Sequence, residues 1–193
     1  LLMSSPSMDH LCNLHSLTAG QIHASSHKVA PSDGLSAEMI AGYKRIPYRY
    51  RAQILSALLI SSSEIDDAKS EAYFSKSLQA VQNAFNTLID ALQSKKVRIQ
   101  DVFTLEMICL CVELFGGISR SSEMCHPERI PIFMSPCLPQ LSSLMMYYAS
   151  DITICEILLR LFRDYTEQFI VMLNRDQCLA VFRASAGLHS SYL

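Results

Sequence analysis

Apolar residues recur at three- and four-residue intervals in two neighbouring stretches near the C-terminal end of the chain. The first stretch carries Leu138, Leu141, Leu144, Met145 and Tyr148. The second carries Cys155, Leu158, Leu159, Phe162, Tyr165, Phe169, Ile170 and Leu173. This spacing places the side chains on one face of an α-helix. Since only Ala149, Ser150 and Asp151 separate the stretches, we expect two antiparallel helices that pack against each other.

The opposite face of the second helix carries charged residues. Glu156 and Arg160 stand four residues apart, as do Arg163 and Glu167. Oppositely charged side chains at this spacing meet on the surface of a helix, and each pair stabilises the helix by roughly 0.2–0.5 kcal/mol. We therefore expect this face to lie in solvent.

Two earlier helices are expected from the same pattern. One begins at Tyr48, directly after Pro47, and fades through the serines at 61 to 63. The next, from about residue 69 to residue 94, has a stripe of Phe74, Leu78, Val81, Phe85, Leu88 and Leu92. Its opposite side carries Lys76, Gln79, Asn83, Asn86, Asp90 and Gln93, so we expect that side to be wet.

Two further helices are delimited by capping signals. Asp101 can cap a helix whose apolar residues surround its axis, and Gly116 with Gly117 is expected to end it. Residues 120 to 135 are expected to form a loop, with a helical turn near Ile130. Asn174 followed by Gln177 resembles a capping box and predicts a final helix. That helix carries the apolar residues Cys178, Leu179, Phe182 and Ala186.

The helix pairs predict a repeat architecture. Their first helices start near Tyr48, Asp101 and Asp151, a period of about 50 residues, slightly above the roughly 40–47 residues of HEAT repeats. We therefore expect an all-α fold, an α-solenoid of about three HEAT-like antiparallel helix pairs over residues 44–193. Residues 1–43, rich in Ser and His, are expected to be poorly ordered or partly helical. Because the chain begins with Leu, we expect it to be a segment of a longer protein.

The composition narrows the possible functions. Half of the residues are apolar and only 18% are charged, against about 25% in an ordinary soluble domain. Either burial is unusually complete or apolar surface awaits a partner, and we favour the second alternative. A net charge of −2 provides no general field for nucleic acid or anionic lipid, so we expect neither nucleic-acid binding nor membrane insertion. The apolar run at 102–118 contains Glu106 and Glu113, which favours a buried protein helix over a membrane span.

The candidate chemical sites are weak. Cys12, His15, His23 and His27 have a spacing loosely like that of a zinc site, but the surrounding residues lack the core of a zinc finger, so we expect no metal and no cofactor. Cys109 and Cys111 lie on different sides of one helix and are expected to be core thiols. Cys125 beside His126 lacks a third orienting group, so we expect no catalytic residues and no enzyme activity. The pair Met145 and Met146 is expected to fill the core.

One basic cluster is a candidate binding surface. Lys44, Arg45, Arg49 and Arg51 are interleaved with Tyr43, Tyr48 and Tyr50. An exposed helix start explains this cluster most simply. The more specific alternative is that the cluster binds an acidic protein partner. Stacking of RNA bases on the tyrosines is the least supported of the three explanations.

Three stretches carry a resemblance to a known family. They are residues 51–59 (RAQILSALL), residues 107–118 (MICLCVELFGGI), and residues 152–169 (ITICEILLRLFRDYTEQF) with the sequence NRDQCLAVFRASAGLHSSYL beyond them. In their order along the chain, these stretches resemble part of a nuclear transport receptor of the importin-beta superfamily.

The resemblance implies a function without chemistry. It implies a longer HEAT solenoid that binds the GTP form of the GTPase Ran, nuclear pore proteins and folded cargo, and moves between cytoplasm and nucleus. It implies cargo such as the hypusine-containing translation factor or Smad-type regulators for export, and Sox-type factors for import. No individual contact residue carries over from the family. The alternatives are a HEAT or armadillo scaffold for another multiprotein complex, and a cysteine hydrolase.

Overall fold

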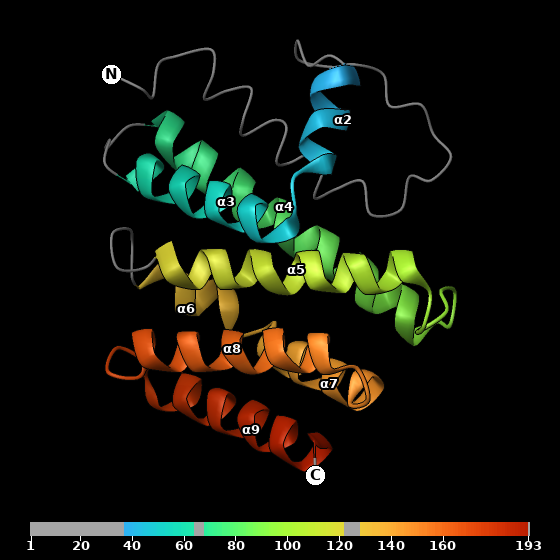
Figure 1. Ribbon diagram of the computed structural model, residues 1–193. Coiled ribbons are helices and arrows are strands. Elements are labelled where there is room, and N and C mark those ends of the chain that lie inside the picture. The colour runs from blue at the N-terminus through green and yellow to red at the C-terminus, as the bar shows by residue number, and fades with distance from the viewer. Residues whose placement is uncertain (1–36, 64–67, 122–127, 193) are drawn as a thin grey trace.

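The computed structural model describes residues 37–63, 68–121 and 128–192, and this part of the chain consists of helices joined by turns, with no β-strand (Figure 1). The expected all-α class is therefore confirmed for these residues. The helices are α2 (Ala37–Arg45), α3 (Tyr48–Ser63), α4 (Ala68–Gln93), α5 (Val102–Ser121), α6 (Arg129–Met134), α7 (Leu138–Tyr148), α8 (Ile152–Phe169) and α9 (Arg175–Tyr192).

Three helices lie side by side in the order α3, α5, α8, as Figure 1 shows. They begin at Tyr48, Val102 and Ile152, within one residue of the expected starts of the three pairs. The intervening helices make a second set of contacts, in which α4 packs on α3 and α5, and α7 packs on α8 and α9. The five aromatic residues among the largest fully buried side chains come from α4, α5 and α8; they are Phe74, Phe85, Phe115, Tyr165 and Phe169.

The expected helix starts are confirmed by side-chain caps. Asp151 accepts hydrogen bonds from the backbone N–H groups of Thr153 (3.0 Å) and Ile154 (3.1 Å) at the start of α8. Asp101 accepts one from the backbone of Thr104 (3.2 Å) at the start of α5. Such a cap contributes about 1 kcal/mol by satisfying amide groups that have no partner within the helix.

The capping box before α9 is also formed. The Asn174 side chain accepts from the backbone N–H of Gln177, and the Gln177 side chain accepts from that of Asn174, both at 2.9 Å. The sequence pattern therefore predicted the start of α9 correctly.

The end of α5 differs from the expectation. Gly116 and Gly117 do not terminate the helix, which continues to Ser121. Both glycines are buried, and a Cβ on Gly117 would stand 2.4 Å from the carbonyl oxygen of Ala52 in α3. The missing side chain thus lets the backbones of α5 and α3 approach closely, which is a second common use of glycine besides ending helices.

The buried stripes agree with the sequence for α4 and only partly for α8 and α9. All six expected stripe residues of α4 are buried, and its six polar residues are exposed. In α8, Leu159 is exposed, as is Ile170 just beyond the helix, whereas the other stripe residues of the helix are buried. In α9, Leu179 and Phe182 are exposed, because the helix turns Val181, Ala184 and Leu188 towards the core.

The contact between α7 and α9 sets this rotation of α9. The Ser142 hydroxyl of α7 donates a hydrogen bond to the Ala184 carbonyl of α9 at 2.8 Å. Small residues, Ala184 and Gly187, face Ser142 and permit the close approach. The apolar residue Phe182, 71% exposed, consequently lies on the outer surface together with Val171. The structure therefore leaves apolar side chains exposed on α9 and beside it.

Two short helices modify the expected outline. Helix α2, at 37–45, belongs to the stretch expected to be at most partly helical. Helix α6 forms at the turn expected near Ile130, which is fully buried. The rest of that stretch, residues 1–36, lies outside the described residues.

Helix α5 is long and apolar enough to cross a membrane by length and composition alone. Within the fold, however, 72% of its most apolar window is buried, as expected for the core helix of a globular protein. No other helix among the described residues meets the same criterion.

We predict opposite effects for alanine at the two adjacent glycines of α5. Gly117→Ala would force its Cβ into the Ala52 carbonyl, and we expect a loss of about 1–3 kcal/mol in the free energy of unfolding. Gly116→Ala meets only the flexible end of Arg120, at 3.1 Å, so improved helix propensity should leave stability near or above that of the wild type. Urea unfolding followed by circular dichroism measures both. Equal stability of the two variants would contradict the close approach of α3 and α5.

Candidate functional site

The predicted basic cluster is divided by the fold. Lys44 and Arg45 end α2 and Arg49 lies in the first turn of α3, and all three side chains are exposed. Arg51 instead turns inward, with its guanidinium carbon 6.0 Å from the centre of the Tyr43 ring. Three of the four cations therefore remain available at the surface.

The tyrosines of this cluster do not form a stacking platform. Tyr43 is buried, and burial raises its pKa to about 12. Tyr48 is half-buried, and only Tyr50 is exposed. Since bases stack on several exposed aromatic faces in proteins that bind single strands, this geometry does not favour the RNA alternative.

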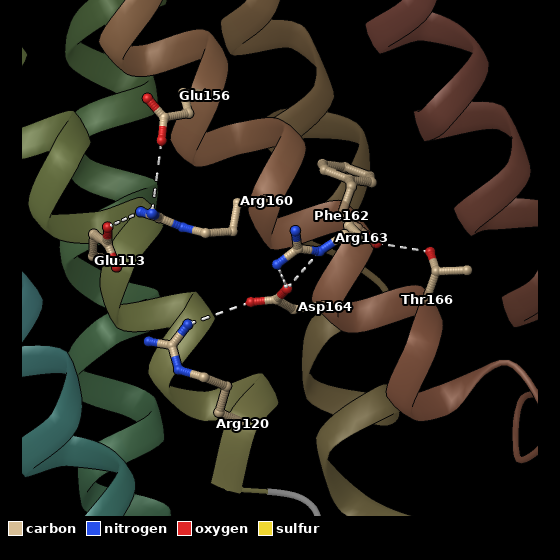
Figure 2. A network of polar contacts seen from close by, with 8 residues as sticks. All are labelled: Glu113, Arg120, Glu156, Arg160, Phe162, Arg163, Asp164 and Thr166. Atoms are coloured by element: carbon tan, nitrogen blue, oxygen red, sulfur yellow. Dashed lines mark hydrogen bonds and ion pairs between the residues drawn. The ribbon is translucent and has the colours of Figure 1, made fainter.

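A second set of charges lies between α5 and α8 (Figure 2). Glu113 of α5 is 95% buried, and its carboxylate accepts a hydrogen bond from the Arg160 guanidinium of α8. Arg160 also stands 4.0 Å from Glu156, one turn earlier in its own helix. A buried carboxylate requires a paired cation, because desolvation of an isolated charge costs several kcal/mol.

Asp164 is the second acidic centre of the network. Its carboxylate lies 3.5 Å from the Arg120 guanidinium of α5 and accepts two hydrogen bonds from Arg163, at 2.7 and 3.1 Å (Figure 2). The expected pairing of Arg163 with Glu167 is therefore replaced by a contact with the neighbouring residue. The expectation that the charged face of α8 lies wholly in solvent is wrong, because part of that face contacts α5.

The network links α5 to α8 through two ion pairs. Its carboxylates are each paired with a guanidinium, and arginine does not lose its proton in the physiological range. Within the described ranges, no group of three His, Cys, Asp or Glu side chains is arranged to hold a metal ion. The signal for the network was present in the sequence, since Glu113 inside an apolar run needs a basic partner.

Four of the five described cysteines, Cys109, Cys111, Cys137 and Cys155, are buried, as predicted for Cys109 and Cys111. Burial raises the pKa of Cys109 to about 11, of Cys111 to about 12 and of Cys137 to about 11. Since the thiolate is the nucleophile, these residues are poorly suited to covalent catalysis. Cys178 is half-buried. The weak zinc candidates at Cys12, His15, His23 and His27, and the Cys125–His126 pair, lie outside the described residues.

The methionine pair is split between core and surface. Met145 is fully buried, as expected for a core-filling residue, whereas Met146 is 73% exposed. Met146 lies near the end of α7, next to the exposed Tyr147.

A groove that the sequence did not reveal lies where the α4–α5 turn meets the end of α7. We call it the turn groove. It has a volume of about 840 Å³ and is lined by Leu92 of α4, Lys95 and residues 97–101 of the turn, Val102 of α5 and Tyr147 of α7. In Figure 1, the α4–α5 turn and the α7–α8 connector lie at the same end of the molecule. Tyr147 is distant in sequence, so no local pattern could have joined it to the turn.

Comparisons with known proteins assign no relative. Neither the family models, nor the curated proteins, nor the solved structures contain a match to this chain.

We predict that the α5–α8 ion pair stabilises the fold more than its exposed neighbour does. Glu113→Gln leaves the Arg160 charge without its buried partner, and we expect a loss of about 2 kcal/mol in the free energy of unfolding. Glu156→Gln is the matched control, and should cost no more than about 0.5 kcal/mol because Glu156 is 72% exposed. Urea denaturation at neutral pH compares them. A Glu156 variant as unstable as the Glu113 variant would contradict the assignment.

We also predict that the described cysteines differ in reactivity. Because their raised pKa values keep the thiols protonated, Cys109, Cys111 and Cys137 should resist iodoacetamide in the folded protein at pH 7.5, while the more accessible Cys178 reacts first. Labelling of Cys109 and Cys137, whose pKa is about 11, should rise at lower pH than labelling of Cys111, whose pKa is about 12. Peptide mapping by mass spectrometry resolves each site. Rapid labelling of Cys111 at pH 7.5 would contradict the observed burial.

Proposed function

We propose that the chain is a segment of an exportin-4-like nuclear transport receptor of the importin-beta superfamily. In this proposal it binds folded protein cargo in a manner that depends on Ran-GTP, and it shuttles between cytoplasm and nucleus. The observation that carries the proposal is the side-by-side order of α3, α5 and α8, which begin about 50 residues apart. Together with the family resemblance of the sequence, this order supports a HEAT-like array.

The second helices of the proposed pairs support the same arrangement. In such a solenoid, α4, α6 with α7, and α9 would be the second helices, and the contact between α7 and α9 is the one that neighbouring second helices make. The break between α6 and α7 falls at 135–137, around Pro136, which cannot continue a helix without loss of a backbone hydrogen bond.

Surface complementarity, rather than catalysis, is the proposed mode of action. The cysteines that the structure describes are buried or half-buried, and the carboxylates between α5 and α8 are paired with arginines. Exposed apolar residues such as Val171 and Phe182 offer surface to a neighbouring repeat or to a protein partner. Small rotations between repeats would let the array open and close with Ran.

The proposed partners are Ran in its GTP form, nuclear pore proteins and protein cargo such as the hypusine-containing translation factor or Smad-type regulators. Lys44, Arg45 and Arg49 are exposed cations that suit an acidic protein surface. Arg51 is less suited to this role, since it is turned towards Tyr43.

The decisive experiment measures nucleotide dependence. The complete gene product, immobilised on beads, is incubated with cell extract and with Ran loaded either with a non-hydrolysable GTP analogue or with GDP. We expect the recovered cargo to change about tenfold between the two nucleotide forms, within the range typical of coupled binding sites. Ran-GTP itself should be retained on the beads.

Equal recovery of all partners with both forms of Ran would overturn the transport proposal and favour the alternative of a HEAT or armadillo scaffold. A Ran mutant that does not load nucleotide serves as the control for nonspecific retention.

A further inference from the structure

The turn groove combines aliphatic walls with an exposed rim. Leu92 at its base is buried in the core, whereas Val102 is 69% exposed and Ile99 and Tyr147 are partly exposed. Exposed apolar side chains gathered around a concavity are typical of sites that take an apolar anchor from a partner. At about 840 Å³, the groove is large enough for one or two such side chains and their backbone.

The rim carries positive charge in a chain whose net charge is −2. Lys95, Lys96 and Arg98 are exposed, and Lys95 and Arg98 line the groove itself. The lining holds one acidic residue, Asp101, which accepts hydrogen bonds from the backbone and the hydroxyl of Thr104, so two cations of the lining stand against one carboxylate. The groove therefore presents an excess of cations beside apolar walls.

The backbone of Lys95 holds this cation at the rim. The turn after α4 is a Schellman motif, in which Lys96 donates to the Ala91 carbonyl (3.0 Å) and Lys95 donates to the Leu92 carbonyl (3.1 Å). Lys95 occupies the left-handed position of the motif, with φ of 54°. Glycine is the usual residue at that position, so a lysine there is conformationally unfavourable.

We propose that the turn groove binds an acidic, apolar peptide segment of a partner protein. An aliphatic or aromatic side chain of the peptide lies against Val97, Val102 and Tyr147, and its flanking carboxylates lie at Lys95 and Arg98. The charge complementarity favours an acidic segment, and the aliphatic walls favour a peptide over a nucleic acid, which would need several aromatic faces for stacking. The proposed peptide binding does not involve Ran, so its test is separate from the test of the transport function.

The test uses the full 193-residue chain and a short fluorescein-labelled peptide in which Asp and Glu alternate with Leu and Phe. Fluorescence anisotropy should show saturable binding that weakens as salt rises. Two matched peptides separate the contribution of the acidic side chains from that of the apolar ones. One has Lys in place of the acidic residues, and the other has Ser in place of the apolar residues. Both should bind at least tenfold more weakly. A single-stranded RNA and anionic lipid vesicles are the competing probes.

Variants of the groove cations separate a role in peptide binding from a role in stability, because each variant is measured for both peptide affinity and thermal unfolding. Lys95→Gly should weaken peptide binding about threefold and yet raise the midpoint of thermal unfolding by about 2 °C, because glycine relieves the left-handed conformation. Arg98→Gln should also weaken binding about threefold. Arg183→Gln removes one exposed cation from α9, outside the groove, and should leave binding unchanged.

The proposal is overturned if the acidic peptide does not bind, if the lysine peptide binds equally well, or if RNA or vesicles bind more tightly than the peptide. It is also overturned if Arg183→Gln weakens binding as much as Arg98→Gln does, since the contacts would then reflect only the total charge.

Discussion

The close packing of α5 between α3 and α8 is the constraint on which the rest of the structure depends. On one side, the absence of a side chain at Gly117 brings α5 to within van der Waals contact of the Ala52 backbone. On the other side, Glu113 reaches Arg160 from within an apolar helix. Helix α5 thus needs α3 beside Gly117 and needs α8 to supply the Arg160 cation for Glu113. These two contacts place α5 between α3 and α8.

The low content of charged residues is consistent with this arrangement. Several charges serve contacts between helices, such as those of Arg160 and Asp164, instead of covering the outer surface. Hydrophobic burial supplies most of the driving force, and the ion pairs define how α8 lies on α5. The surface in turn keeps apolar residues, of which Val171 and Phe182 are the most prominent on the α9 side.

The two candidate surfaces differ in origin. The basic cluster at the α2–α3 corner is local in sequence, and the fold keeps Lys44, Arg45 and Arg49 exposed while it withdraws Arg51. The turn groove is assembled from three helices and a turn, and one of its two lining cations, Lys95, is held by the Schellman motif that ends α4. Both surfaces carry exposed cations, so in both cases the partner we propose is an acidic protein.

The sequence by itself determined the helices that have local signals. The caps at Asp101, Asp151 and Asn174 and the stripe of α4 depend on residues three or four apart, so they could be predicted from the chain alone. Only the tertiary structure decided the path of α5 through Gly117, the inward turn of Arg51, the exposed position of Phe182 and the pairing of Glu113 with Arg160. Each of these depends on which helix lies opposite. The contacts of Gly117 with Ala52, Glu113 with Arg160 and Ser142 with Ala184 join residues some 40 to 65 positions apart and leave no periodic trace in the sequence. Arg51 meets Tyr43 of the preceding helix, and the packing of α2 on α3 decides that contact.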